Sequence, residues 1–347
     1  MNCLHETSTI TTCFSSSSTS SLMEAAGVPP LCFPNFNSSC RRLLRPRPEA
    51  AVLYALLAFV SLLTVTLNML VIVSISHFRQ LHTPTNALLL SLAVADLVVG
   101  LLVMPIEGLR YMETCWLLGR LMCALTPYVS YCLLSASVGN MVLISIDRYL
   151  AICDPLLYST KITLKRVKVS ICSCWTGSII YNGLILLDHI RQPDKFTSCH
   201  GECVVVISHI SGTVDLFFTF VGPCTVMVVL YMRVFVVAVS QVRVIRLQTA
   251  ATAAPTAKKS ERKAAVTLGI VIAVFLMCFC PYYYPAFAGE DTSNSLSYFA
   301  VVSWIMLINS CVNPLIYALF YPWFRKAIKL IFTLRILQPH SREAKIL

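Results

Sequence analysis

The chain has 347 residues, of which 57% are hydrophobic and only 12% are charged, and its formal net charge is +11. Soluble domains have about 25% charged residues, so the composition excludes an ordinary soluble enzyme and indicates a polytopic membrane protein. The positive charge does not indicate a nucleic-acid partner, because basic residues that flank membrane spans produce the same excess.

Residues 1–48 are polar and rich in Ser and Thr, and we expect them to form an extracellular N-terminal segment. No basic region precedes an apolar one there, so we expect no cleaved signal peptide. Asn37-Ser38-Ser39 is a glycosylation sequon, which has meaning only if this end is extracellular. The basic residues around Arg41 oppose that orientation, but a larger basic group between later spans supports it. The C-terminus is therefore expected in the cytoplasm.

Seven apolar stretches follow, each long enough to cross a bilayer as a helix. They cover residues 50–77, 85–112, 119–153, 167–189, 204–240, 260–288 and 296–320. The sequence thus predicts an all-α membrane protein, with a seven-helix domain over 49–320. Residues 321–333 alternate apolar and basic side chains at helical spacing, which predicts a short amphipathic eighth helix on the inner leaflet before a short cytoplasmic tail that ends at 347.

The third stretch begins near Cys123 and ends at the charged cluster Asp147-Arg148-Tyr149. Charges at a helix end can reach the interface, whereas charges in the middle of a span are costly. Polar residues do lie inside other spans: Asn68 in the first, Asp96 in the second, and Asn309 and Asn313 in the seventh. Such groups are functional candidates, and the alternative is a hydrogen-bond network that holds the helices in register.

The third stretch resembles the third transmembrane helix of rhodopsin-like G-protein-coupled receptors, and each of the seven spans carries a residue typical of that family. These residues are Asn68, Asp96, Arg148, Trp175, Pro223, Pro281 and Pro314. The resemblance implies an allosteric sodium site formed by Asp96, Ser137, Asn309 and Asn313, and no other cofactor. It also implies a heterotrimeric G protein as partner, besides membrane lipids.

The same resemblance implies a switch at the inner end of the bundle. Glu261 is placed to pair with Arg148 and so to hold the inactive state. Asn313-Pro314-Leu315-Ile316-Tyr317 resembles the NPxxY motif, and Tyr231 matches the fifth-span tyrosine. Pro281 and Pro314 remove helix hydrogen bonds, so their helices can kink. Phe279 replaces the tryptophan that is usual two residues before the sixth-span proline, which implies a softer toggle.

A narrower resemblance comes from residues 309–324, NSCVNPLIYALFYPWF. They match every fixed position of NSxxNPxxYxxxYxWF, the signature of trace amine-associated receptors. ISHFRQLHTPTN at 75–86 and ERKAAVTLGI at 261–270 are similar to the same family. The resemblance implies an olfactory receptor for amines that couples to a stimulatory G protein and raises cyclic AMP.

The usual ammonium partner of that family is missing from the third span. It lies 18 residues before the Arg, where this chain has Ser130, and Leu307 replaces a common pocket tyrosine. Asp215 on the fifth span is the expected replacement, because it shares a helical stripe with Thr219, and also with Ser211, Phe218 and Gly222. The alternative is that Asp215 only makes a hydrogen bond to a neighbouring helix or to the second outer loop. A fish subgroup of these receptors is similar in taking the amine on a fifth-span Asp.

Aromatic residues at the outer ends of the spans are candidate walls for the ligand: Tyr131, Tyr282, Tyr283 and Trp304. Each can equally be core packing. The family resemblance also implies two disulfides. One joins Cys123 to Cys203, and the second joins the N-terminal segment to Cys199. We favour Cys40 as its partner over Cys32, although sequence alone does not fix the connectivity.

Two other classes of protein fit the sequence less well. A transporter needs charges in several spans or interrupted helices, and an intramembrane enzyme needs a nucleophile with a base or a set of metal ligands. Neither HExxH nor GxSxG occurs in the chain. A rhodopsin-like receptor for a non-amine ligand is the closest alternative, because Ser130 removes the commonest amine anchor.

Overall fold

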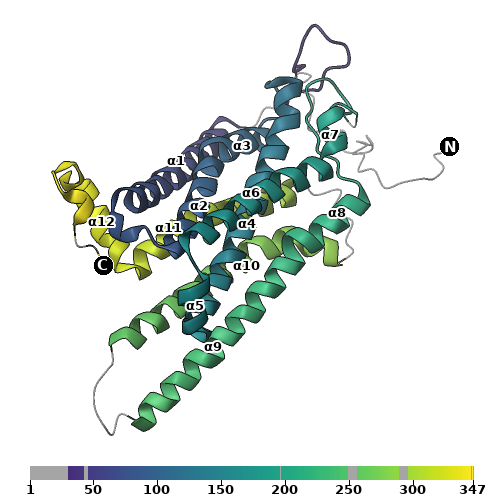
Figure 1. The fold of residues 1–347 in the computed structure, drawn as a ribbon. Coiled ribbons are helices and arrows are strands. Elements are labelled where there is room, and N and C mark those ends of the chain that lie inside the picture. Colours follow the sequence, from purple (N-terminus) through teal and green to yellow (C-terminus); the bar gives the residue numbers. More distant parts are fainter. Residues whose placement is uncertain are drawn as a thin grey trace.

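The computed structural model describes residues 30–42, 46–195, 197–248, 256–288, 296–344 and 346, although a few side chains within these ranges, among them Glu261, are not described. Seven long helical segments run side by side in the part of the chain described, as Figure 1 shows. Helix α1 spans Arg47–His77, α4 spans Gly119–Cys153 and α6 spans Leu164–Ile185. Helices α10 (Thr256–Ala288) and α11 (Leu296–Phe320) complete the bundle with the two composite segments below.

The second and fifth segments are composite, because each contains a π-helical turn. In the second, α2 (Pro84–Val98) continues through η2 (Val99–Val103) into α3 (Met104–Met112). In the fifth, α8 (His209–Asp215) continues through η3 (Leu216–Val221) into α9 (Gly222–Gln248). A π turn adds a residue to the helical repeat and so changes which side chains face the bundle.

Five segments are long and apolar enough to cross a membrane among the residues described: Pro48–His77, Pro84–Met112, Gly119–Cys153, Ile210–Val237 and Ala300–Phe320. A shorter apolar stretch, Gly269–Pro285, lies in α10. The expected spans therefore match the helices closely, except that the fifth begins later. Residues 202–208 are not helical, and Cys203 among them is tied to Cys123 on α4.

Short elements join the segments at their ends. Helix η1 (Arg79–Leu81) leads into α2, α5 (Pro155–Lys161) follows α4, and α7 (Leu187–Arg191) follows α6. Helix α12 (Pro322–Phe332) follows α11 and buries Trp323, Phe324 and Ala327 while exposing Arg325 and Lys326. This is the amphipathic pattern that the sequence predicts. Two short turns, η5 (Arg335–Leu337) and η6 (Ser341–Glu343), end the chain.

Three disulfides hold one end of the bundle, which we call the disulfide end. They join Cys123 to Cys203, Cys40 to Cys199 and Cys32 to Cys115. The first two are the pairings that we favoured, whereas Cys32 takes Cys115, which the sequence analysis did not consider. The opposite end carries Asp147 and Arg148, and we call it the Arg148 end.

Candidate functional site

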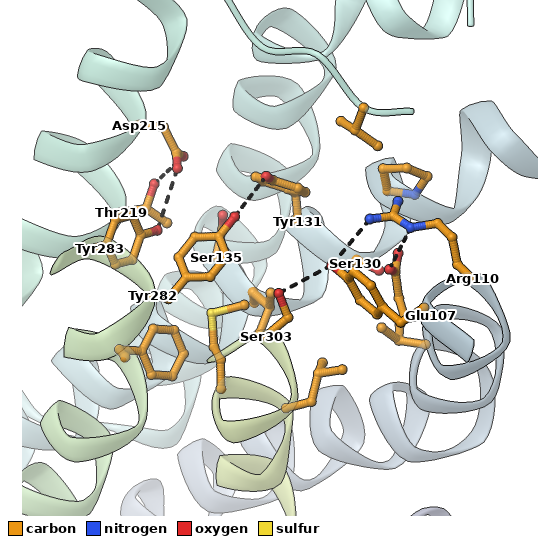
Figure 2. Close-up of a pocket in the computed structure, with 18 residues that line it drawn as sticks. Glu107, Arg110, Ser130, Tyr131, Ser135, Asp215, Thr219, Tyr282, Tyr283 and Ser303 are labelled. Atoms are coloured by element: carbon orange, nitrogen blue, oxygen red, sulfur yellow. Dashed lines mark hydrogen bonds and ion pairs between the residues drawn. The ribbon is translucent and has the colours of Figure 1, made fainter. Parts of the chain in front are cut away.

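A small cavity lies between the helices toward the disulfide end, and Figure 2 shows the residues around it. It has a volume of about 90 Å³. Its lining residues come from the second segment (η2 and α3), α4, α10, α11, the fifth segment and the loop before it: Val103, Glu107, Arg110, Tyr111, Pro127, Ser130, Tyr131, Leu134, Ser135, Val205, Asp215, Thr219, Phe279, Tyr282, Tyr283, Ser303, Met306 and Leu307. The space suits a small molecule rather than a peptide.

Asp215 ends α8 and presents its carboxylate to this cavity. Its residue surface is only 6% exposed. Three hydroxyl groups donate to it: Thr219 and Tyr181 to Oδ1, the latter at 3.3 Å, and Tyr283 to Oδ2 at 3.5 Å. No Lys, Arg or His pairs with Asp215 among the residues described.

The π turn η3 explains why Asp215 and Thr219 face the cavity while other members of the expected stripe do not. Phe218 is 72% exposed and Gly222 is also exposed, so both positions depart from the expectation. Phe220 is buried instead, and its ring stacks on Tyr283 with 4.5 Å between centroids. A stripe counted at regular α-helical spacing misses this shift because η3 holds an additional residue.

Tyrosines and Phe279 form the apolar wall beside Asp215. The Tyr131 and Tyr282 hydroxyls lie 3.3 Å apart, so one donates to the other across α4 and α10. Tyr283 packs edge-on against Tyr282, and Phe279 stacks on Phe275. Trp304 does not line the cavity, contrary to the expectation. Its indole lies against Gly108 instead, where it packs between α11 and α3.

A second charged group, which the sequence analysis missed, lines the cavity away from Asp215 (Figure 2). Arg110 pairs with Glu107 through Nε and Oε2 at 3.2 Å. Its Nη2 donates to the Tyr111 hydroxyl at 3.3 Å, and that hydroxyl donates to Ser303 Oγ at 3.2 Å. Two opposite charges three residues apart inside the apolar stretch 85–112 were the available signal.

The polar residues of the middle of the bundle surround Asp96, which is fully buried. Asn313 Nδ2 donates to Asp96 Oδ2 at 3.0 Å, and the Ser137 hydroxyl lies near the same carboxylate. Four buried oxygens make no hydrogen bond of normal geometry in the part of the structure described: Asp96 Oδ1, Ser137 Oγ, Asn309 Oδ1 and Asn313 Oδ1. Asn313 and Ser137 thus lie beside the Asp96 carboxylate and offer oxygen atoms, the ligands that hard cations prefer.

At the Arg148 end, Asp147 and Arg148 pair with each other. Arg148 Nη2 lies 2.5 Å from Asp147 Oδ2 and also donates to the Thr85 hydroxyl. Thr85 and Tyr158 donate to Asp147 at 2.8 Å and 3.1 Å. Burial raises the pKa of Tyr158, so this hydroxyl stays a donor at neutral pH. The expected pairing of Arg148 with Glu261 concerns a side chain outside the described set.

The other residues that the sequence analysis expected to form a switch lie on the predicted helices. Tyr149 packs with Ile152 and Val234 between α4 and α9. Tyr231 on α9 lies against Gly269 on α10, where an added Cβ would meet its hydroxyl. Pro314 lies inside α11, and the buried Tyr317 ring packs edge-on near Tyr321. Asn37 is exposed in a turn between Cys32 and Cys40.

Comparison with known proteins agrees with this architecture. Residues 67–317 match the model of the family described as 7 transmembrane receptor (rhodopsin family). The chain is 37% identical over 325 residues to trace amine-associated receptor 13c of Danio rerio, covering 91% of this chain and 95% of that one. It is 38% identical over 336 residues to trace amine-associated receptor 1 of Macaca mulatta, covering 91% and 98% of the two chains.

A third relative, trace amine-associated receptor 7c of Rattus norvegicus, is 39% identical over 326 residues, which cover 90% of each chain. Receptors of this family are not enzymes, and the apolar helices place the chain in the plasma membrane as a multi-pass protein. The chain belongs to the rhodopsin family of seven-transmembrane receptors and, within it, to the trace amine-associated receptors.

Proposed function

We propose that this receptor detects small amines and that Asp215 binds the ligand's ammonium group. The observation that carries the proposal is a buried carboxylate in a cavity, with hydroxyl donors around it and no cationic partner among the described residues. Burying a carboxylate is costly unless a positive charge compensates it. A bound ammonium supplies that charge.

The hydrogen bonds indicate which oxygen is open to the ligand. Oδ1 accepts from both Tyr181 and Thr219, whereas Oδ2 accepts only the 3.5 Å bond from Tyr283. A carboxylate oxygen accepts two hydrogen bonds, so the ammonium binds at Oδ2. At about 4 Å and an effective dielectric near 20, the attraction is on the order of 4 kcal/mol. The hydroxyl donors fix the carboxylate before the ligand arrives.

The remaining walls define the size of the amine. Tyr131, Tyr282 and Tyr283 offer ring faces to an alkyl or aromatic body, and Ser130 leaves space where a larger anchor is usual in the family. Leu307 lines the same cavity as an apolar contact. In this assignment the receptor resembles the fish subgroup that takes the amine on the fifth segment.

Signalling passes through the Arg148 end to a heterotrimeric G protein of the stimulatory or olfactory type, and raises cyclic AMP in an olfactory cell. The Asp147–Arg148 pair and its Thr85 contact support this end as the switch. Glu261 holds the inactive state, and Tyr231 and Tyr317 rearrange on activation. The N-terminus is extracellular, where Asn37 is glycosylated, and α12 lies on the inner leaflet.

A sodium ion bound by Asp96, Ser137, Asn309 and Asn313 acts as an allosteric ligand. The buried Asp96 carboxylate, with Asn313 and Ser137 beside it, supports this site. Sodium binding is tested by the thermal stability of the purified receptor in sodium against choline chloride, with Asp96→Asn as the variant. We expect sodium to stabilise the natural receptor and not the variant. A sodium effect of equal size in both contradicts the assignment.

The amine assignment is tested by screening amines against cyclic AMP in cells that express the receptor, with Asp215→Asn alongside. The amide keeps the size of the side chain but removes its charge, so we expect at least a hundredfold loss of potency, about 3 kcal/mol. The exposed Asp188 on α7 gives the matched control, Asp188→Asn. Surface expression is measured for each variant.

An unchanged dose–response curve for Asp215→Asn at normal surface expression contradicts the amine anchor. Activation by uncharged ligands alone would instead favour the alternative, a class A receptor for a non-amine small molecule. The loss of Asp from position 130 is the feature that favours this alternative.

A further inference from the structure

The cavity contains polar groups that an ammonium on Asp215 leaves unused. They lie around Arg110, which Figure 2 places away from Asp215 with Tyr131 between them. Arg110 has five N–H donors. Nε contacts Glu107 and Nη2 contacts Tyr111, but Nη1 is fully buried and has no hydrogen-bond partner in the described structure. A buried donor without a partner is costly, so a ligand acceptor there gains in affinity.

Ser130 provides a second and independent observation. It is only 7% exposed, lines the same cavity, and its hydroxyl makes no hydrogen bond among the described residues. A serine hydroxyl inside a helix can donate to the carbonyl of its own preceding turn, as the Ser145 hydroxyl does in the same helix. Ser130 does not use this contact, so its donor is available to a ligand.

The charges of the cavity decide what kind of acceptor belongs there. Glu107 already neutralises Arg110, at 3.2 Å, so the pair has hydrogen-bonding capacity left but needs no further charge. Asp215 is the remaining unpaired charge. A ligand with one ammonium makes the cavity neutral, whereas an added carboxylate leaves a negative charge and a second ammonium leaves a positive one. Uncompensated charges in a buried site are unfavourable.

We propose that the Arg110 end of the cavity binds an uncharged oxygen acceptor of the ligand, such as a hydroxyl or carbonyl, through Arg110 Nη1 and Ser130 Oγ. The ligand class is then a monoamine that carries a neutral oxygen at a set distance from its nitrogen. This inference rests on the proposed function, because it takes the ammonium to lie on Asp215.

The first experiment measures binding to the purified full-length receptor by its ligand-dependent thermal stability. The probes are four matched series of increasing chain length: n-alkylamines, ω-amino alcohols, ω-amino carboxylates and α,ω-diamines. We expect one chain length at which the amino alcohol binds about tenfold tighter than the alkylamine of the same length, as expected for a hydrogen bond to a charged donor. We expect the carboxylates and diamines to bind more weakly than that amino alcohol.

The second experiment removes the donor without leaving a lone buried charge. The double variant Glu107→Met with Arg110→Met replaces an ion pair by apolar side chains of similar length, a change that proteins often tolerate. We expect the affinity ratio of amino alcohol to alkylamine to fall to about threefold or less, which is the part that Ser130 Oγ still supplies. Asp215→Asn is the matched comparison: it weakens both probes and preserves their ratio.

Ser130→Ala gives a milder variant in case the double variant does not reach the membrane, and we expect it to lower the ratio a few-fold. The proposal is overturned if the ratio is one at every chain length in the natural receptor, if it survives unchanged in the double variant, or if a carboxylate or diamine binds best. If alkylamines bind but the amino alcohols bind no more tightly at any chain length, only this inference fails and the proposed function stands. If no amine of any series binds, the proposed function fails as well.

Discussion

Asp147 and Asp215 are both buried carboxylates, and their surroundings differ in one respect. Asp147 is paired with Arg148 at 2.5 Å and accepts two hydroxyls as well. Asp215 accepts three hydroxyls and has no cation among the described residues. A carboxylate whose cation is built into the chain can hold a conformation, whereas one that lacks its cation can bind a charged partner from outside. In our proposal the first therefore serves the switch and the second serves recognition.

The largest expected effect that separates the two sites comes from Asp147→Asn. Breaking a buried ion pair leaves Arg148 uncompensated and costs about 3 kcal/mol. We expect the thermal stability of the receptor to fall by several degrees and its ligand-independent cyclic AMP to rise, because Arg148 is released. The affinity for amines is measured in parallel, and we expect it to stay close to that of the natural receptor. A large loss of amine affinity would mean that the two sites are not separable.

Tyr181→Phe is expected to act at the recognition site with a smaller effect. It removes the 3.3 Å hydrogen bond to Asp215 Oδ1, so the carboxylate is no longer held in place before binding. Immobilising a side chain costs roughly 0.5–1.5 kcal/mol, which predicts amine affinity roughly twofold to tenfold weaker. Tyr128→Phe is the matched control, because that hydroxyl donates to the Ile179 carbonyl instead. Equal effects of the two variants would contradict a specific role for Tyr181.

Tyr158→Phe is the corresponding change beside Asp147, and we expect the smallest effect from it. One 3.1 Å hydrogen bond to Asp147 Oδ1 is lost while Arg148 and Thr85 still hold the other oxygen. One hydrogen bond contributes about 0.5–1.5 kcal/mol to stability, and we expect this one to lie near the low end. Its loss therefore predicts roughly a twofold rise in ligand-independent signalling. Ligand-independent cyclic AMP per receptor at the cell surface is the measurement. A change as large as that of Asp147→Asn would show that the hydroxyl, not the ion pair, dominates.

The sequence predicted the helices well because long apolar stretches and terminal charges are local signals. It also singled out Asp215, since a carboxylate in an apolar span is conspicuous. It did not predict that Phe220 rather than Phe218 packs inward, because η3 changes the helical count. It left Trp304 open between a cavity wall and core packing, and the indole packs against Gly108.

Other parts of the site depend on which helices meet, and no local pattern reports that. Tyr181 on α6 donates to Asp215 on α8, although the two residues are 34 positions apart in the sequence. Cys115 follows α3, yet it closes a disulfide with Cys32 across a separation of 83 residues. The Glu107–Arg110 pair is different, because its spacing of three residues was visible in the sequence.

The π turn at Leu216–Val221 has a consequence for how receptors of this kind can change. Each residue of an α-helix turns the chain by about 100° about the helix axis. Deleting one residue of this segment that does not line the cavity would therefore turn Asp215 by about a quarter of a circle relative to α9, although every residue that contacts the ligand would still be present. The carboxylate would then point toward lipid, and the amine would lose its anchor. Insertions and deletions in this short segment could therefore retune ligand choice in related genes in a single step, where point substitutions in the cavity would need several.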